Sequence, residues 1–249
     1  MMKWIMSQLL PPRFQSVQLD PCLPFILQAE ISTGPFHAAC CQFDASAFTP
    51  QLARQFGLVL PEPLRHAVKK RQAEYVASRW LVAKLLARSN LPNFQLFNRP
   101  DRSPIWPTGK VGSLSHHDHK IFTLIESGPV WVGNDIERML TQEKAAELRS
   151  MIMTAEELAL LTQSGLSLSQ ATTLVFSVKE TLYKAVYPAV QTLFGFEQVT
   201  LIAIDPHAGK ITVQLSTVAL PKSSRQARWD IHYWLTDTEV MSWVVQGAL

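Results

Sequence analysis

The sequence predicts a protein of mixed helices and short β-strands, and three observations support that class. Apolar residues between positions 62 and 88 recur at approximately helical spacing. Residues 130–137 instead alternate apolar and polar or acidic side chains, as a half-buried strand does. A capping-box pattern from Thr154 to Glu157 lies inside the helical stretch 141–161 and therefore predicts two helices there.

Turn and breaker residues place the remaining elements. The first 60 residues are rich in proline and glutamine and lack a helical period, so we expect irregular structure with a few short strands. Leu91-Pro92 and Pro188 are expected to end the first and last long helices, because proline interrupts a helix. The other predicted elements are a loop from Arg99 to Gly109, a helix over 169–186, and strands at 121–125, 199–204, 211–215 and 229–235.

Composition limits the classes of function. The chain has 249 residues, 47% of them hydrophobic, and a formal net charge of only +3, which does not describe a nucleic-acid-coating protein. Its length allows one large domain or two modest ones with real cores. The cysteines Cys22, Cys40 and Cys41 form neither a disulfide framework nor a zinc spacing, which fits a reducing cytosol. The sequence has no long apolar run and no signal-peptide cleavage pattern, so we expect a cytoplasmic protein without stable membrane insertion.

A pair of carboxylates is the first candidate for chemistry. Asp135 and Glu137 lie two residues apart on the predicted strand and therefore share a face. Like charges side by side repel unless a cation lies between them, and carboxylate oxygens are ligands that Mg²⁺ prefers. The simpler alternative is a solvated strand edge that carries two acids.

A second candidate lies on the last predicted helix. Glu180 and Lys184 are four residues apart and share a helical face. They could supply a third carboxylate for a cation and a lysine that neutralises phosphate. The alternative is an ordinary surface ion pair that contributes about 0.3 kcal/mol.

Two further polar clusters precede these residues. Ser115 and His116 stand before the strand predicted at 121–125, where a loop could present them to a phosphate. The neighbouring histidines suggest zinc, but adjacent histidines point apart, so a phosphate contact is favoured over zinc and a solvated polar loop over both. A run of basic residues is usually a solvated face. The basic residues of the first long helix and the loop after it are Lys69, Lys70, Arg71, Arg79 and Arg102.

The sequence contains no motif for a protein nucleophile or a nucleotide-binding loop. G-x-S-x-G, the Walker loop and G-x-G-x-x-G are all missing from it. Acids, a lysine and a histidine without a nucleophile favour phosphoryl-type transfer by positioning and charge neutralisation.

Three segments are more specific in their order than any one of them alone. They are Gly112-Ser-Leu-Ser-His116, Gly133-Asn-Asp-Ile-Glu137 and Phe176-Ser-Val-Lys-Glu-Thr-Leu-Tyr-Lys184. In this order they resemble the 4'-phosphopantetheinyl transferases. Three finer features are similar to the enterobactin synthetase component D-like branch: Arg71-Gln-Ala-Glu74 with Ser78-Arg79, the Trp106-Pro-Thr-Gly109 loop, and Phe194-Gly-Phe196.

Two residues depart from the family pattern. Asn134 stands where the family usually has isoleucine or valine, and Ser78 replaces the usual glycine. On an alternating strand, Asn134 points away from the face of Asp135 and Glu137. Both changes leave the three carboxylates in place.

The resemblance implies an α+β fold, a pseudo-dimer of two similar halves that each pack a long helix on a small antiparallel sheet. Residues 1–130 would form the N-terminal half, with coenzyme A phosphate, adenine and carrier contacts. Residues 131–249 would form the C-terminal half, with the metal and catalytic motifs. The implied enzyme is a 4'-phosphopantetheinyl transferase. It moves the arm of coenzyme A to a serine of an apo acyl, peptidyl or aryl carrier protein in a Mg²⁺-dependent reaction, releases 3',5'-adenosine bisphosphate, and works as a monomer.

The same resemblance implies residue roles. The residues that would hold Mg²⁺ are Asp135, Glu137 and Glu180. The residues that would contact coenzyme A are Ser115, His116, Lys184, Arg71, Arg79 and Arg102. The residues that would act in catalysis are Glu180 as general base, Lys184, and Lys179, which could instead simply pair with a carboxylate.

Two rival hypotheses are a Mg²⁺-dependent phosphohydrolase or nuclease and a non-enzymatic carrier-binding subunit. The first would release phosphate without any carrier protein. The second would be favoured by loss of a carboxylate, and none of the three is lost. Among transferases, siderophore or nonribosomal peptide synthesis is the expected pathway, and a polyketide or polyunsaturated fatty acid synthase is the alternative.

Overall fold

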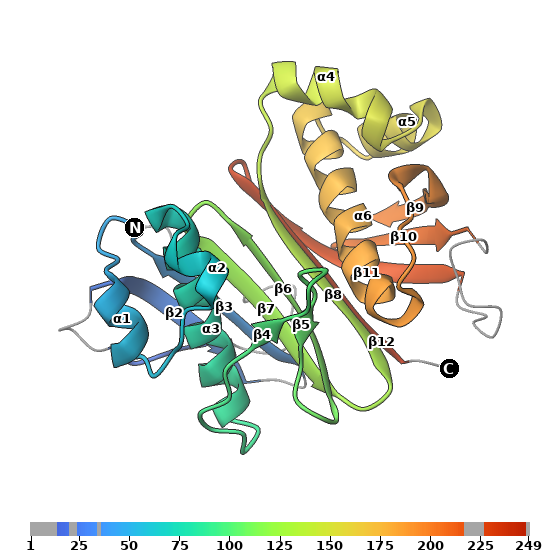
Figure 1. The fold of residues 1–249 in the computed structure, drawn as a ribbon. Coiled ribbons are helices and arrows are strands. Elements are labelled where there is room, and N and C mark those ends of the chain that lie inside the picture. Colours follow the sequence, from blue (N-terminus) through green and yellow to red (C-terminus); the bar gives the residue numbers. More distant parts are fainter. Residues whose placement is uncertain (1–13, 20–23, 34–35, 217–226, 248–249) are drawn as a thin grey trace. The chain divides into compact units, whose positions relative to one another are not determined.

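The computed structural model describes residues 14–19, 24–33, 36–216 and 227–247; Cys22 and the extreme N-terminal segment lie outside these ranges. The chain divides into two compact units, residues 1–128 and residues 129–249. Both units combine helices with an antiparallel sheet (Figure 1), so the fold mixes α and β structure as the sequence predicts.

A five-stranded antiparallel sheet of order β1-β2-β3-β7-β6 forms the base of the first unit. Its strands are β1 (Phe14–Ser16), β2 (Ile26–Ser32), β3 (His37–Phe43), β6 (Lys110–His117) and β7 (Lys120–Ser127). Three of the five strands thus come from the first 60 residues, where irregular structure with a few short strands was expected. The central strand, β3, is apolar on both faces, so it is buried without the alternation that marks a half-buried strand.

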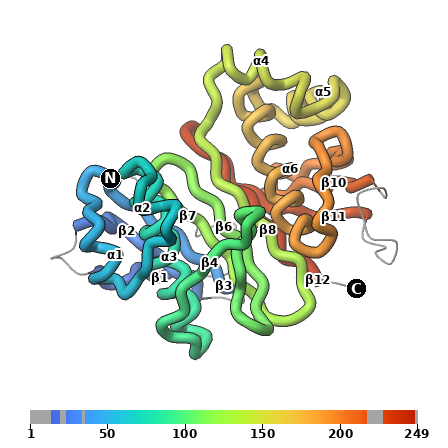
Figure 2. Tube along the Cα trace, viewed as in Figure 1, coloured from blue at the N-terminus to red at the C-terminus, as the bar shows by residue number. Residues whose placement is uncertain are grey.

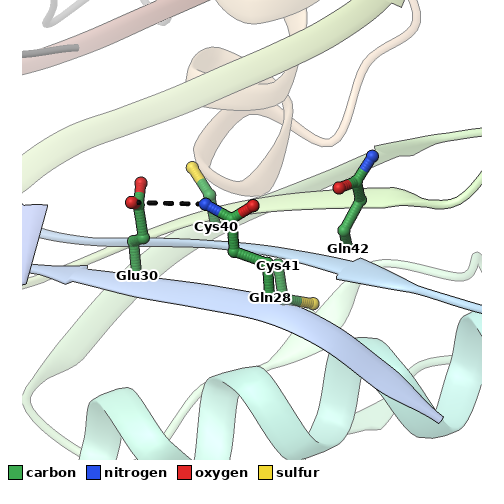
Figure 3. Close-up of a pocket in the computed structure, with 5 residues that line it drawn as sticks. All are labelled: Gln28, Glu30, Cys40, Cys41 and Gln42. Carbon is green, nitrogen blue, oxygen red and sulfur yellow. Dashed lines mark hydrogen bonds between the residues drawn. The ribbon is translucent and has the colours of Figure 1, made fainter. Parts of the chain in front are cut away.

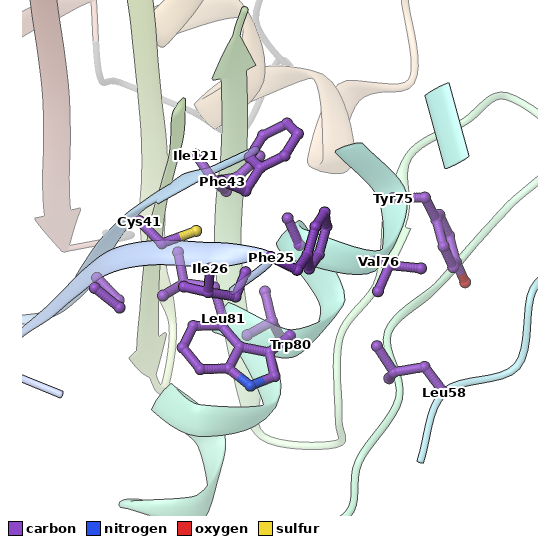
Figure 4. Close-up of a cluster of buried hydrophobic side chains, with 14 of the residues drawn as sticks. Phe25, Ile26, Cys41, Phe43, Leu58, Tyr75, Val76, Trp80, Leu81 and Ile121 are labelled. Carbon is purple, nitrogen blue, oxygen red and sulfur yellow. The ribbon is translucent and has the colours of Figure 1, made fainter. Parts of the chain in front are cut away.

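The long helix of the first unit packs on this sheet. A short helix α2 (Glu62–Arg65) precedes α3 (Lys69–Ala87), so the helical stripe predicted over 62–88 is two helices. In the core, α3 contacts β3 and β7, and Figure 4 shows Phe25, Val76 and Leu81 within this apolar cluster. The helix ends at Ala87, before the predicted stop at Leu91-Pro92. The small elements around it are α1 (Pro50–Gln55) and the hairpin of β4 (Phe97–Asn98) and β5 (Pro104–Ile105).

The second unit has its own five-stranded antiparallel sheet, of order β8-β12-β11-β10-β9. The strands are β8 (Val130–Arg138), β9 (Val199–Asp205), β10 (Lys210–Leu215), β11 (Arg228–Leu235) and β12 (Glu239–Gly247). Strand β12 was not predicted, yet it lies between β8 and β11. The helices are α4 (Gln142–Ile152), α5 (Ala155–Gln163) and α6 (Leu168–Val190), with a 3₁₀ turn, η2, at Phe196–Gln198.

Helix termini in the second unit follow the side chains at their ends. The capping box of Thr154 and Glu157 begins α5, which confirms the two helices predicted over 141–161. Helix α6 begins at a second capping box and continues past Pro188 to Val190. The predicted stop at Pro188 was therefore wrong. A proline in the last turn removes a single backbone hydrogen bond, and α6 ends two residues later at Val190, followed by the C-cap residue Gln191, whose φ is 50°. None of the described helices is long and apolar enough to cross a bilayer.

Helix α6 packs directly on β8 and β12 (Figure 2). Gly133 allows this close contact, because a Cβ atom at that position would collide with the carbonyl oxygen of Thr181 and lie 2.9 Å from the Cβ of Ala185. The oxygen belongs to the helix backbone and cannot swing aside. The glycine of the Gly133–Glu137 motif therefore sets the distance between helix and strand.

Gly133→Ala should lower the free energy of unfolding of the second unit by about 1–3 kcal/mol, the usual cost of overpacking a close contact. Gly247→Ala on the paired strand β12 is the matched control, because nothing lies within 4 Å of a Cβ there. Chemical denaturation followed by circular dichroism measures both variants. Equal stability of the two would contradict the packing argument.

Candidate functional site

The second unit brings a carboxylate of β8 and a lysine of α6 into contact. Lys184 Nζ lies 2.6 Å from Asp135 Oδ1. The Asp135 side chain is 2% exposed, whereas that of Lys184 is 28% exposed, so the lysine reaches the buried carboxylate from the solvent side. Hydrogen bonds between two charged groups are among the strongest in proteins, and burial strengthens this one further.

Glu180 joins this pair from the same helix. Burial raises the pKa of the Glu180 carboxyl, the nearby Lys184 ammonium lowers it, and the Asp135 carboxylate raises it. The carboxyl is thus close enough to feel both charges. We name Asp135, Glu180 and Lys184 the acidic cluster: two carboxyl groups and one ammonium at the contact of α6 with β8.

This cluster has the right kind of donors for a hard cation such as Mg²⁺, because carboxylate oxygens are its preferred protein ligands. As the side chains stand, no group of three or more His, Cys, Asp or Glu within the described ranges could hold a metal ion. Glu137 lies two positions beyond Asp135 on β8 and is half-buried. Its role as a third ligand stays a prediction.

Lys179, the other lysine of the motif on α6, is held inside the protein. Its ammonium lies 3.1 Å from Glu157 Oε1 and donates to the carbonyl oxygens of Ile152 and Phe196 at 2.9 and 3.2 Å. Glu157 also accepts hydrogen bonds from the backbone N–H groups of Thr154 and Leu201. Lys179 thus pairs with a carboxylate and joins α6 to the start of α5 and to η2. Pairing of Lys179 with a carboxylate was one of the two expectations, but the sequence pattern marked Glu157 only as a helix cap and not as the partner.

In the first unit, Ser115 and His116 lie inside strand β6, paired with β7, and the expectation that a loop presents them was wrong. Strands β6 and β7 pair across a tight turn, so the polar residues before that turn form the end of β6. Arg71 Nη1 lies 3.3 Å from His116 Nε2 and 3.2 Å from a carboxylate oxygen of Glu74. The fold therefore gathers Arg71, His116 and Glu74 at one place.

The two other arginines differ in their surroundings. Arg79 is buried, donates to the carbonyl oxygen of Leu96 and to the side chain of Asn98, and stacks 4.2 Å above the Tyr75 ring. Burial lowers the pKa of Arg79. Arg102 is exposed in the turn that joins β4 to β5, where its φ is 70°. Arg79 thus anchors the β4–β5 hairpin, and its contact with coenzyme A, like that of Arg102, stays a prediction.

A small pocket lies on the first unit's sheet and is lined by residues of β2 and β3 (Figure 3). Gln28 Nε2 donates to Glu30 Oε1 at 3.4 Å, and burial raises the pKa of Glu30. No sequence-predicted site residue lines this pocket. It is therefore not part of the candidate site.

The fold and these clusters define a class: an α+β protein whose polar groups suit phosphate chemistry. Comparison with known proteins gives the family. A family model for the 4'-phosphopantetheinyl transferase N-terminal domain matches residues 60–126, and one for the 4'-phosphopantetheinyl transferase superfamily matches residues 131–244.

Individual relatives agree with the family models. Enterobactin synthase component D of Salmonella typhi is 34% identical over 165 residues, 66% of this chain and 67% of the relative. The protein of the same name from Escherichia coli K12 is 33% identical over 140 residues, 56% and 66% of the two chains. The 4'-phosphopantetheinyl transferase Svp of Streptomyces mobaraensis is 28% identical over 176 residues, 68% and 70% of the two chains. The chain belongs to the 4'-phosphopantetheinyl transferase family, in the branch of enterobactin synthase component D, which confirms the family predicted from the three motifs.

Lys179→Met should destabilise the second unit by about 3 kcal/mol or more, because it leaves the Glu157 carboxylate buried without its ammonium partner. The double variant Lys179→Met/Glu157→Gln should recover much of that loss, since the remaining amide is neutral. Denaturant unfolding of the two single variants and the double variant gives the coupling energy. Additive losses would show that the pair contributes nothing as a pair.

Proposed function

We propose that this protein transfers the 4'-phosphopantetheine arm of coenzyme A to a serine of an apo carrier protein and releases 3',5'-adenosine bisphosphate. The observation that supports this most directly is the acidic cluster, which places two carboxyl groups and a lysine at one helix–strand contact. The pyrophosphate of coenzyme A carries charge that a lysine can bind, and the carrier serine carries a proton that a carboxylate can accept.

Lys184 is proposed to bind a phosphate of coenzyme A. Its side chain is the partly exposed member of the acidic cluster, so it can reach a substrate without unfolding the site. When its ammonium turns to a phosphate oxygen, Asp135 loses a positive partner inside the protein. A buried carboxylate needs compensation, which favours a cation bound together with the substrate.

The residues that would hold Mg²⁺ are Asp135, Glu137 and Glu180. When bound there, the ion would neutralise charge on the pyrophosphate as the adenosine bisphosphate departs. This assignment rests on the oxygen donors, the electrostatic repulsion between the Asp135 and Glu180 carboxylates, and the motif positions.

Glu180 is proposed as the general base. Burial raises the pKa of its carboxyl, which makes the ionised form a better proton acceptor. The carrier serine oxygen would give its proton to a carboxylate oxygen of Glu180 and form a bond to the phosphorus that bears the pantetheine arm. The bond from that phosphorus to the adenosine bisphosphate breaks. Lys179 has no place in this scheme beyond holding α6, because its ammonium is committed to Glu157 and two backbone carbonyls.

The first unit is proposed to bind the remaining phosphates through Arg71, His116 and Ser115, and also through Arg79 and Arg102. Arg71 and His116 already lie together, and guanidinium groups bind phosphate oxygens in pairs. We further propose that the two units are the halves of a pseudo-dimer, each with a long helix on a five-stranded sheet. The protein would then act as a cytoplasmic monomer.

The proposed pathway is siderophore or other nonribosomal peptide synthesis. Relatives named enterobactin synthase component D support it. A carrier domain of a polyketide or polyunsaturated fatty acid synthase is the alternative acceptor. Parallel assays with both kinds of apo carrier distinguish them.

Incubation of an apo aryl or peptidyl carrier protein with this protein, coenzyme A and Mg²⁺ should add the mass of one phosphopantetheine arm to the carrier. Asp135→Asn and Glu180→Gln should each lower the rate at least about 100-fold, since both remove a charge from the acidic cluster. A chelator should stop the reaction, and added Mg²⁺ should restore it. Mass spectrometry of the carrier follows all of these reactions.

The outcomes separate the hypotheses. If the wild-type protein transfers the arm and either variant transfers it at the same rate, the proposed assignment of the acidic cluster is wrong. Release of phosphate in the absence of any carrier would favour a hydrolase. Coenzyme A binding by a folded chain that modifies no carrier would favour the carrier-binding subunit.

Arg71→Gln should raise the KM for coenzyme A about tenfold and change kcat little, because it removes one charge-assisted contact to phosphate. Arg65→Gln is the matched control: Arg65 is an exposed arginine of α2 paired with Glu62 at 2.7 Å. Steady-state kinetics with varied coenzyme A measures both. An unchanged KM for Arg71→Gln would remove this arginine from the phosphate site.

A further inference from the structure

Three hydroxyl groups form a closed cluster between α6 and β12. Ser242 Oγ lies 2.8 Å from Ser177 Oγ and 2.6 Å from Thr181 Oγ1. Thr181 Oγ1 also donates to the backbone carbonyl oxygen of Ser242 at 3.3 Å. All three residues are fully buried. We name them the hydroxyl cluster.

The hydrogen bonds of this cluster have one consistent direction. One arrangement of the protons satisfies every contact: Thr181 donates to the carbonyl oxygen of Ser242, and Ser242 donates to Thr181 Oγ1. Ser177 must then donate to Ser242. Each hydroxyl proton is used once, and such chains of hydrogen bonds have a defined geometry that apolar contacts lack.

The hydroxyl cluster is next to the acidic cluster, both on α6 and across the paired strands β12 and β8. On β12, Ser242 is directly opposite Asp135 of β8. On α6, Thr181 follows Glu180 immediately and precedes Lys184 by three residues, close to one helical turn. A change in the height or rotation of α6 over the sheet would therefore move Glu180 and Lys184 relative to Asp135.

We propose that Ser242, Ser177 and Thr181 are positioning residues of the transferase site. Their hydroxyl groups fix α6 on β12 so that Glu180 and Lys184 meet Asp135. This inference rests on the proposed function of the acidic cluster. It adds to that function a residue, Ser242, that lies outside all three sequence motifs and on a strand that the sequence did not predict.

Apolar packing alone does not define this arrangement. In the core below α6, side chains such as Leu174, Val178 and Leu182 pack through apolar contacts, which are not directional. Gly133 sets how closely α6 approaches β8. Because glycine has no side chain, this contact does not determine the position of the helix along the strand. Directional hydrogen bonds to Ser242 supply that constraint.

The test compares substitutions of threonine on one helix. Thr181→Val keeps the shape of the side chain and removes the hydroxyl, whereas Thr181→Ser keeps the hydroxyl. Thr172→Val is the matched control, because Thr172 is also a fully buried residue of α6 and its Oγ1 has no hydrogen-bond partner within the described ranges. Ser242→Ala removes the hydroxyl from the strand side.

The assays are arm transfer to an apo carrier and calorimetric binding of coenzyme A, both well below the melting temperature of every variant. Thr181→Val and Ser242→Ala should lower kcat/KM about 10-fold to 100-fold, the usual effect of removing a group that orients a catalytic side chain. Both should also weaken coenzyme A binding through Lys184. Thr181→Ser should keep the rate within about threefold of wild type, and Thr172→Val should behave as wild type.

Activity of Thr181→Val equal to that of Thr172→Val would overturn the inference. A loss in Thr181→Ser as large as in Thr181→Val would also overturn it, because the hydroxyl would then not be the group that matters. Failure of wild type to modify any carrier would instead overturn the proposed function. Should Thr181→Val not fold, the comparison of Ser242→Ala with Thr172→Val decides the question in the same way.

Discussion

The second unit depends on one close contact, the passage of α6 over β8 at Gly133. A side chain there would collide with the carbonyl of Thr181, so the helix reaches the strand only because the motif begins with glycine. Two residues further along the same strand, Asp135 meets Lys184 of the helix at 2.6 Å. An ammonium and a carboxylate form such a bond only over a short distance. The glycine of the motif therefore acts on the acidic cluster through packing, while the acids and the lysine carry the charge.

Two lysines of one helix illustrate how burial separates structure from function. Lys179 is 2% exposed and has three acceptors around its ammonium. If the ammonium moved away, the Glu157 carboxylate would remain buried without a positive partner. Lys184 is 28% exposed and bonded to a carboxylate at the solvent side. An ion pair that water can reach exchanges partners at low cost, which is what the phosphate contact proposed for Lys184 requires. The same residue type thus holds the helix at one position and is available to a ligand at the other.

Local pattern was enough to predict the parts of the fold that depend on nearby residues. The strand at 130–137, the capping box of Thr154 and the shared helical face of Glu180 and Lys184 all follow from short-range periodicity. The parts that failed depend on distant partners. Strand β12 is defined by its pairing with β8, which places Ser242 opposite Asp135 although the two residues lie near opposite ends of the second unit's sequence. Likewise, the residues around Lys179 do not indicate that Glu157 is its partner, and those around Arg79 do not indicate the carbonyl of Leu96. Both partners are brought close by tertiary contacts.

The departure at Asn134 can be understood from the same geometry. Strand alternation turns Asn134 to the side of β8 away from α6, and the sheet register places it opposite Trp243, whereas Asp135 is opposite Ser242. The amide is fully buried on that side. Any contribution of the Asn134 amide to stability is therefore made on the face of the sheet that α6 does not contact. The residues that set the acidic cluster, Gly133 and the hydroxyl of Thr181, lie on the opposite face. A polar residue inside the Gly133–Glu137 motif is thus compatible with the acidic cluster, because Asn134 and Asp135 point to opposite faces of the strand.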